Sequence, residues 1–196
     1  MGEPSEPGVP TPLDGAALLV LAVAAIGARL GRAAHTPAVP ESARLTAPGS
    51  SFVTLERDGR LLGCIGSLEA RRPLYLDVVR NAVRALTDPR LPPVTVADWP
   101  ELAVKVAVLT APVPLPAAGL DALLTALQPG VDGLLLTDGT RRSTFLPAVW
   151  GKLPEPGRFV TALLAKGGWP GWSAGIQAYR YASVDFVDRS PRQPLL

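Results

Sequence analysis

The sequence predicts an α+β fold: an antiparallel β-sheet with flanking helices, built from two β-hairpin/helix repeats that form two lobes. Asp58-Gly59 lies between short apolar segments and is typical of a two-residue hairpin turn, and Asp138-Gly139 is a second hairpin signal. A helical pattern follows each hairpin, and a further strand pattern follows each helix. Because this order is the same in both halves, an internal duplication at the level of structure is expected, although the halves share no obvious identity.

The first repeat is predicted from strands at 51–55 and 60–66, a helix at 73–86 and a strand at 102–109. Residues 35–50 are predicted to form a loop. The helix is expected to have one apolar face, made of Leu76, Val79, Val83 and Leu86. Asp77 is expected to lie off this face.

The second repeat is predicted from strands at 134–137 and 141–146, a helix at 156–166 and a last strand at 176–186. A further helix is expected at about 119–127. Lys166, followed by two glycines, is interpreted as the basic C-terminal end of the helix at 156–166.

The chain ends are predicted to lie outside the folded domain. Residues 1–12 are rich in Pro, Gly and Glu and are expected to be disordered, 13–187 form the domain, and 188–196 are a flexible C-terminus. The apolar run at 15–26 predicts a buried first helix with Asp14 as its N-cap. It is shorter than the ~20 residues that cross a bilayer, and acidic residues precede it, so no membrane role is expected.

Composition excludes several classes of protein. Hydrophobic residues make up 47% of the 196 residues, enough for a sizeable core, and the net charge is only +2. Without a basic stripe, nucleic-acid binding is not expected. One cysteine and one histidine allow no internal disulfide and no ordinary zinc site. No dinucleotide or phosphate-loop motif occurs, so no cofactor is predicted. The single cysteine favours a reducing, cytoplasmic location, and the bias toward Arg, Ala, Pro and Gly indicates a bacterial source.

Cys64 is the best single candidate for chemistry. It lies between Gly63 and Ile65-Gly66 at a strand end, where glycines allow positive φ and close approach of a ligand. Arg71-Arg72 and a following helix N-terminus are a source of positive potential for a thiolate. Alternatively, Cys64 is a small buried hydrophobic residue.

Two further groups are candidates for a binding site. Arg141 and Arg142 are expected to point to opposite faces of a strand, so one of them can bind an anionic group; alternatively, both are solvated. Asp88 and Arg90 flank Pro89 in a rigid loop, where the simpler interpretation is a local ion pair that holds the loop.

Several ordered motifs resemble the AMMECR domain family, which includes the AmmeMemoRadiSam system protein A. The segment 61–67 resembles the family's Leu-Arg-Gly-Cys-Ile-Gly signature, and 88–93 resembles its Asp-Pro-Arg-Phe-x-Pro loop. The segment 129–134 resembles Pro-Gly-x-Asp-Gly-Leu, and 144–150 resembles Thr-Phe-Leu-Pro-x-Val-Trp. The resemblance covers about residues 15–187.

The resemblance implies an α+β antiparallel fold with the glycine-cysteine motif in a cleft. It implies no established reaction, but it does imply partners: a Memo-like protein and a radical S-adenosylmethionine enzyme. Leu62 stands where the family has Arg, so Arg60, Arg141 or Arg142 is expected to replace that group. The expected ligand pocket, which would suit a small anionic ligand, comprises Gly63, Cys64, Ile65, Gly66, Ser67, Asp88, Arg90, Arg141, Arg142 and Thr144.

Two functions remain open from the sequence. The first is a binding or accessory component of the AmmeMemoRadiSam system, in which the glycines shape a pocket. The second is a thiol-dependent enzyme or modification subunit that uses Cys64. The first is preferred because the sequence shows no base or metal partner for the thiol.

Overall fold

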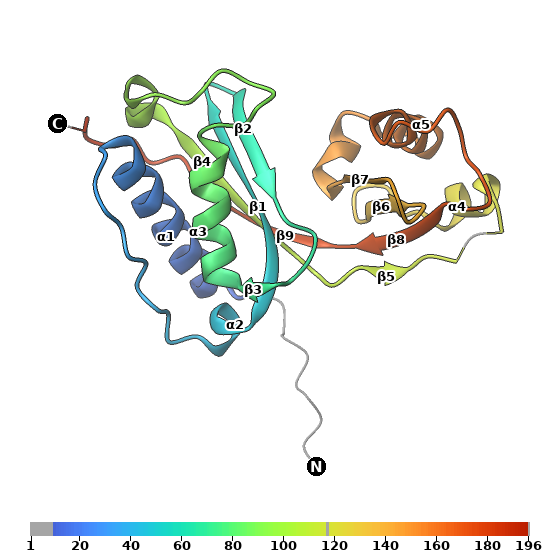
Figure 1. Ribbon diagram of the computed structural model, residues 1–196, viewed down its shortest axis with the longest axis horizontal. Helices are drawn as coiled ribbons and strands as arrows, with labels where there is room; N and C mark the ends of the chain where they lie inside the picture. Colours follow the sequence, from blue (N-terminus) through green and yellow to red (C-terminus); the bar gives the residue numbers. More distant parts are fainter. Residues whose placement is uncertain (1–9, 117, 196) are drawn as a thin grey trace, which may run out of the picture. The chain divides into compact units, whose positions relative to one another are not determined.

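The computed structural model describes residues 10–116 and 118–195 and divides the chain into two compact units. Unit 1 comprises Met1–Leu109 and Val184–Leu196, and unit 2 comprises Thr110–Ser183. Each unit contains an antiparallel sheet and helices, which confirms the predicted α+β class (Figure 1). The predicted disorder at residues 1–9 falls outside the described residues.

Unit 1 is a five-stranded sheet with α1 and α3 packed on one face (Figure 1). Its strand order is β2-β1-β4-β9, with β3 paired to β1. The strands are β1 (Pro48–Arg57), β2 (Arg60–Gly66), β3 (Arg72–Pro73), β4 (Ala103–Leu109) and β9 (Ser183–Asp188). The helices are α1 (Pro12–Leu30), α2 (Ala43–Thr46), α3 (Leu74–Ala85) and the 3₁₀ helix η1 (Val96–Glu101). The expected loop at 35–50 therefore contains α2 and the start of β1.

The first predicted hairpin is present as β1 and β2. Asp58 and Gly59 both have positive φ, 50° and 74°, as a two-residue turn of the primed type requires. The pairing shifts after Leu55, which lies opposite Gly63, because Glu56 lies opposite Leu61. Leu62 is therefore the extra residue of a β-bulge.

The first helix begins earlier than predicted, and its cap is a different residue. Thr11 is the N-cap, and Asp14 is the third helical residue of a capping box in which each side chain bonds the other's backbone N–H. The helix is long and apolar enough to pass a length-and-composition test for a membrane span, but core helices pass the same test. Leu18 and Ile26 are fully buried in the unit 1 core.

The predicted apolar face of α3 was wrong in part. Leu76, Val79 and Val83 are only partly buried, whereas Asp77 is fully buried. The buried face of α3 consists of Leu74, Tyr75, Asp77, Val78, Asn81, Ala82 and Ala85. A carboxylate on the face that packs against the sheet needs compensating partners.

Unit 2 is a four-stranded sheet with the order β5-β8-β6-β7. Its strands are β5 (Val113–Pro114), β6 (Gly133–Thr137), β7 (Arg142–Phe145) and β8 (Gln177–Tyr181). Its helices are α4 (Leu120–Ala126), η2 (Pro147–Gly151) and α5 (Pro156–Lys166). In the core, Phe159 stacks on Trp150 with ring centroids 3.8 Å apart and meets the edge of Phe145 at 5.3 Å.

The repeated order predicted from the sequence is present in both units. Unit 1 runs β1-β2-α3-β4, and unit 2 runs β6-β7-α5-β8. The single strand expected at 176–186 is instead two strands, because the chain leaves the ladder at Ala182 and β9 belongs to the sheet of unit 1.

The C-terminal segment, predicted to be flexible, makes contacts with unit 1 over its described residues. Trp99 Nε1 donates to Gln193 O at 2.9 Å, and the Arg192 guanidinium lies 5.2 Å from the Trp99 ring centroid. The segment therefore packs against η1.

Candidate functional site

The segment 63–67 comprises the end of β2, an edge strand of the unit 1 sheet, and Ser67, the residue that follows it. Side chains alternate between the two faces of a strand. Gly63 and Ser67 lie on the face that α3 covers, because Gly63 abuts Ala85 and Ser67 bonds Asp77. Cys64 and Gly66 consequently lie on the opposite face.

Both glycines are required by packing within unit 1. A Cβ on Gly63 would lie 2.0 Å from the carbonyl oxygen of Ala85, and a Cβ on Gly66 would lie 2.2 Å from the Phe52 ring. Neither glycine has positive φ. The expectation of positive φ at these positions was therefore wrong. Their lack of a side chain lets the end of α3 pack against Gly63 and the Phe52 ring pack against Gly66.

The backbone of Cys64 is held on its outer edge by the loop that follows α3. Its N–H donates to Asp88 Oδ2 at 3.0 Å, and its carbonyl oxygen accepts from Arg90 Nη2 at 2.8 Å. On an edge strand these two groups would otherwise be unpaired. Asp88 and Arg90 thus take the place of a neighbouring strand at this one residue.

The thiol of Cys64 lies on the other face, half-buried beside Thr54. The Thr54 hydroxyl donates to Cys64 Sγ at 3.3 Å, and the two residues are direct partners in the β1–β2 ladder. The sulfur is therefore oriented by a neutral hydroxyl.

Asp88 and Arg90 form the local ion pair that was expected, with a further contact to Cys64. Arg90 Nε and Nη2 donate to the two carboxylate oxygens of Asp88 at 2.9 and 2.6 Å. These hydrogen bonds hold the pKa of the Asp88 carboxyl well below its usual range, and they raise the pKa of Arg90. The Asp88 side chain is fully buried, whereas 61% of the Arg90 side chain is exposed. The pair thus anchors a solvent-accessible cation beside Cys64.

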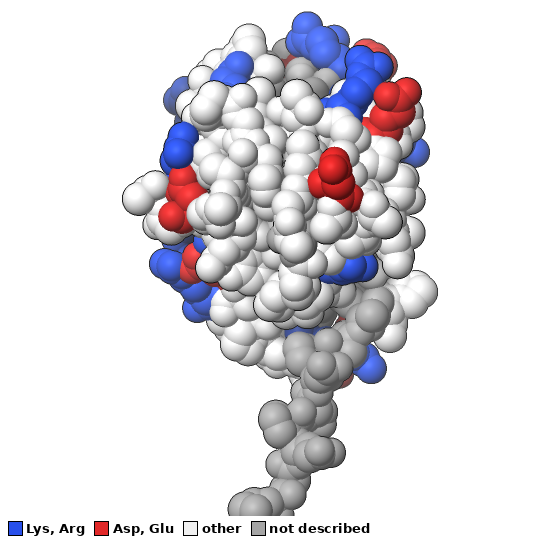
Figure 2. All heavy atoms as spheres, turned by 90° about the vertical axis from the view of Figure 1, so that its right-hand side faces the viewer, with Lys and Arg blue, Asp and Glu red and all other residues white. Residues whose placement is uncertain are grey.

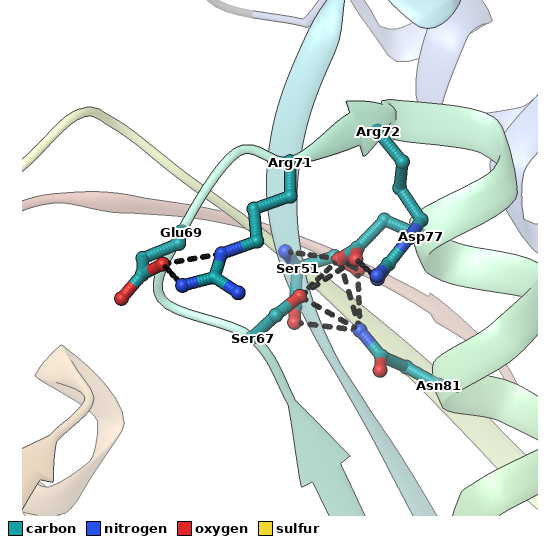
Figure 3. A network of polar contacts seen from close by, with 7 residues as sticks. All are labelled: Ser51, Ser67, Glu69, Arg71, Arg72, Asp77 and Asn81. Atoms are coloured by element: carbon teal, nitrogen blue, oxygen red, sulfur yellow. Dashed lines mark hydrogen bonds and ion pairs between the residues drawn. The ribbon is translucent and has the colours of Figure 1, made fainter.

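A second polar cluster lies between α3 and the sheet, centred on the carboxylate of Asp77 (Figure 3). Ser51 donates to it twice, from its backbone N–H at 3.0 Å and its hydroxyl at 2.9 Å. Ser67 donates from its hydroxyl at 2.6 Å, and Arg72 Nη1 donates at 2.7 Å. These charge-assisted bonds compensate for burial of the carboxylate.

Asn81 completes the Asp77 cluster from one turn further along α3. Its Nδ2 donates to Asp77 Oδ2 at 2.9 Å and to Ser51 O at 3.1 Å. Its Oδ1 is buried and has no partner among the described residues. The cluster holds Ser67, the residue after β2, against the helix (Figure 3).

Sequence reasoning missed Asp77 and Asn81, although a signal was present. Asp77 lies three residues after Leu74 and four before Asn81, and Asn81 lies four before Ala85, so the two polar residues share the helical face that packs against the sheet. An acid and an amide on a buried stripe indicate a fixed polar contact.

Leu62, which stands where the family motif has Arg, is buried in the unit 1 core. The arginine that contacts Cys64 is Arg90, not Arg60, which is exposed in the hairpin. Arg90 comes from the Asp-Pro-Arg loop, so the two motifs meet at one residue.

The remaining predicted residues, Arg141, Arg142 and Thr144, belong to unit 2. Arg141 Nε donates to Asp138 Oδ2 at 2.9 Å, and its Nη1 donates to Gly168 O at 2.8 Å. Arg142 is exposed at the start of β7.

The Thr144 hydroxyl is engaged inside unit 2. It donates to Leu134 O at 2.9 Å and lies 2.6 Å from the Tyr181 hydroxyl, whose pKa is raised to about 12 by burial. Arg141 and Thr144 thus have evident structural partners, whereas the residues that converge on Cys64 are those of unit 1. Over the part of the chain that the structure describes, no group of three or more His, Cys, Asp or Glu could hold a metal ion.

Comparison with known proteins identifies the family of this chain. The AMMECR1 family model matches residues 19–186. The chain belongs to the AMMECR1 family. The motifs at Cys64 and at Asp88 both fall within the matched region.

The relatives are largely archaeal. A protein of Methanothermobacter thermautotrophicus is 41% identical over 104 residues, which cover 51% of this chain and 54% of the relative. The match thus spans just over half the length of that relative. A protein of Thermotoga maritima is 34% identical, with coverage of 67% and 73%. A protein of Aeropyrum pernix is 32% identical, with coverage of 100% and 87%. The bacterial source of this chain stays a prediction.

A solved structure has the same fold. It is that of an uncharacterized protein from Pyrococcus horikoshii, with a TM-score of 0.80 and 27% identity, covering 90% of this chain and 92% of the other. The likeness extends over both units.

Proposed function

We propose that this AMMECR1-family protein is a binding component of the AmmeMemoRadiSam system that uses the segment 63–67 as a fixed recognition surface. Its partners would be a Memo-like protein and a radical S-adenosylmethionine enzyme, in the reducing environment of the cytoplasm. The observation that carries this proposal is the double clamp on Cys64, whose N–H and carbonyl are both bonded to the loop after α3. A segment held in this way is preorganised for binding.

The chemistry beside Cys64 favours an anionic group on the ligand. Arg90 uses Nε and Nη2 for Asp88 and Cys64, and its Nη1 has no hydrogen-bond partner among the described residues. Because the side chain is largely exposed, this amino group can donate to a carboxylate or phosphate. Asp88 holds the guanidinium in place while it does so.

The test is co-purification with the Memo-like protein and the radical S-adenosylmethionine enzyme of the same genome. Wild type and Cys64→Ser are expected to retain both partners, because serine keeps the backbone clamp. Arg90→Gln is expected to lose them, and Arg84→Gln, an exposed arginine of α3, serves as the matched control. Loss of partners with Cys64→Ser, or retention with Arg90→Gln, would overturn the proposal.

A thiol-dependent activity is the second candidate, and one observation favours it. The thiol is only half-buried, and the largely exposed guanidinium of Arg90 donates to the carbonyl oxygen of the same residue at 2.8 Å. A cation therefore lies within electrostatic reach of the sulfur. Rapid, selective alkylation of Cys64 by iodoacetamide at neutral pH would support this role, and an inert thiol in the native protein would exclude it.

A further inference from the structure

Unit 2 contains a pocket that lies apart from the family motifs, since none of the residues that line it belongs to one of them. Its volume is about 310 Å³, and it lies where the chain around β5 passes the start of β8 and the loop before it. This volume is at the lower end of the range for small-molecule sites, so it suits a ligand of one or two rings. A ligand here would be independent of the function proposed for Cys64.

The lining of the pocket is mainly apolar and aromatic. Two prolines, two aromatic side chains and one amide contribute to it, namely Pro114, Pro116, Trp172, Tyr179 and Gln177. No charged side chain is among the described residues that line it. Figure 2 shows the end of unit 2 that carries the loop before β8, and the centre of this surface has few charged side chains. Because a charged ligand would lose water without gaining a counterion, the pocket favours an uncharged one.

Backbone hydrogen bonds hold the walls of the pocket in place. Leu115 N–H donates to Ala178 O at 2.9 Å, which joins the chain after β5 to β8. Ile176 N–H donates to Ser173 O at 3.0 Å and closes a turn in the loop that carries Trp172. The pocket is therefore formed by contacts within unit 2, and a ligand need not order its walls on binding.

Trp172 differs from the other tryptophans of the chain. Trp99, Trp150 and Trp169 each donate the indole N–H to an acceptor within 2.9 Å. Trp172 is half-buried against the core of unit 2, and its indole N–H has no acceptor in the part of the chain that the structure describes. Buried indoles usually find a hydrogen-bond partner. This donor is therefore available to a ligand.

A second donor belongs to Gln177 in the same pocket. The Tyr179 hydroxyl donates to Gln177 Oε1 at 3.1 Å, which fixes the orientation of the amide. The Nε2 group of Gln177 has no hydrogen-bond partner among the described residues. A carbonyl oxygen has two lone pairs and can accept from both donors.

We propose that the pocket at Trp172 binds an uncharged aromatic compound that carries a carbonyl group, with aromatic amides as the simplest members of this class. The ring of the ligand packs against Trp172 and Tyr179, where aromatic pairs add to the gain from buried area. Its carbonyl oxygen accepts from Trp172 Nε1 and Gln177 Nε2.

The first test uses the full chain and benzamide as the probe, and it follows the indole N–H signals of the four tryptophans by two-dimensional NMR. Trp172→Phe identifies the signal of Trp172. In wild type that signal is expected to shift downfield and to saturate with a dissociation constant of about 1 mM. The signals of Trp150 and Trp169 should stay in place, because their N–H groups are already bonded inside unit 2. Benzoate has the same size but carries a charge, and it should bind at least about tenfold more weakly.

The second test measures the affinity of two variants for benzamide from the NMR signals of the probe itself. Trp172→Phe keeps an aromatic ring but removes the N–H, and Gln177→Ala removes the second donor. Each is expected to weaken binding about threefold to tenfold, as the loss of one hydrogen bond does. Gln128→Ala, at another exposed glutamine of unit 2, is the matched control and should bind like wild type. Unchanged indole signals of Trp150 and Trp169 verify that each variant is folded.

Three outcomes would overturn the proposal. The first is a Trp172 signal that does not move at about 20 mM benzamide, well above the expected dissociation constant. The second is benzoate binding as tight as that of benzamide. The third is wild-type affinity in both Trp172→Phe and Gln177→Ala.

Discussion

The two units contain the same hairpin–helix–strand order, but different interactions hold the second strand of each hairpin in place. In unit 1 a basic residue after α3, Arg90, donates to the carbonyl of Cys64 on β2. In unit 2 the last residue of α5, Lys166, donates to the carbonyl of Thr144 on β7 at 2.8 Å. In each unit a cation at or shortly after the end of the helix thus bonds the strand that precedes the helix.

The difference lies in what surrounds each cation. Arg90 is bonded to the buried carboxylate of Asp88, which also binds the backbone N–H of Cys64. Lys166 lies 5.0 Å from the ring centroid of Phe145, which in turn packs on Phe159. The strand in unit 1 is therefore held by buried charge, and the strand in unit 2 is held by aromatic packing. Charge-based contacts have stricter geometry, which suits the unit that carries the Cys64 segment.

The largest effect is expected from Asp77→Ala in the buried polar cluster of unit 1. The change leaves Arg72, Ser51 and Ser67 without their shared acceptor, and breaking a buried charge network typically costs ~3–5 kcal/mol of unfolding free energy. Chemical denaturation measures this loss, with Asp121→Ala, an exposed acid of α4, as the control. A loss below about 1 kcal/mol would mean that the cluster does not hold unit 1 together.

Asp88→Asn tests the clamp on Cys64 and its dependence on pH. At pH 7 the variant is expected to lose about 1.5–3 kcal/mol of unfolding free energy, because an amide cannot accept all of the charge-assisted hydrogen bonds that the carboxylate accepts. The folded-state pKa of Asp88 lies below its ordinary value, so the carboxylate contribution is fully present above about pH 4. It is lost as the pH falls further toward the folded-state pKa.

The measurement is the difference in unfolding free energy between wild type and Asp88→Asn from pH 8 to pH 2. The difference is expected to be constant down to about pH 4 and to shrink below it. A difference that grows on acidification would contradict this account of the clamp.

Gly63→Ala tests whether the glycine of the signature serves packing. A Cβ would lie 2.0 Å from a backbone oxygen of α3, so the helix end must shift, at a cost of about 1–3 kcal/mol. Gly171→Ala in unit 2, where nothing lies within 4 Å of the added Cβ, is the matched control. Equal melting temperatures of the two variants would argue against the packing role.

The smallest effect is expected from Lys166→Met in unit 2. The side chain is exposed, and methionine keeps the apolar contact with Phe145, so the loss should stay below about 1 kcal/mol. Arg90→Met in unit 1 should lower the unfolding free energy by more, because it leaves the buried carboxylate of Asp88 without its cationic partner. If the two variants lose equal stability, the contrast between the two units is wrong.

Local sequence patterns sufficed for the elements of the fold. The Asp-Gly hairpins, the helix at 156–166 and the strand at 102–109 could be predicted because backbone conformation there follows from neighbouring residues. The convergence of the Asp-Pro-Arg loop on Cys64 could not be predicted in the same way. It depends on where the end of α3 meets an edge strand 24 residues earlier in the chain.

The roles of individual polar residues were decided by tertiary structure. Asp77 has the same helical spacing whether its face is buried or exposed, and only the packing of α3 on β1 made it the centre of a cluster. Likewise, Gly63 and Gly66 are recognisable in the sequence, but their contacts are not. Gly63 packs against the Ala85 carbonyl and Gly66 against the Phe52 ring, and both partners are distant in the chain. The sequence thus determines which segments become strands and helices, whereas burial and partners depend on contacts that form only when those segments pack together.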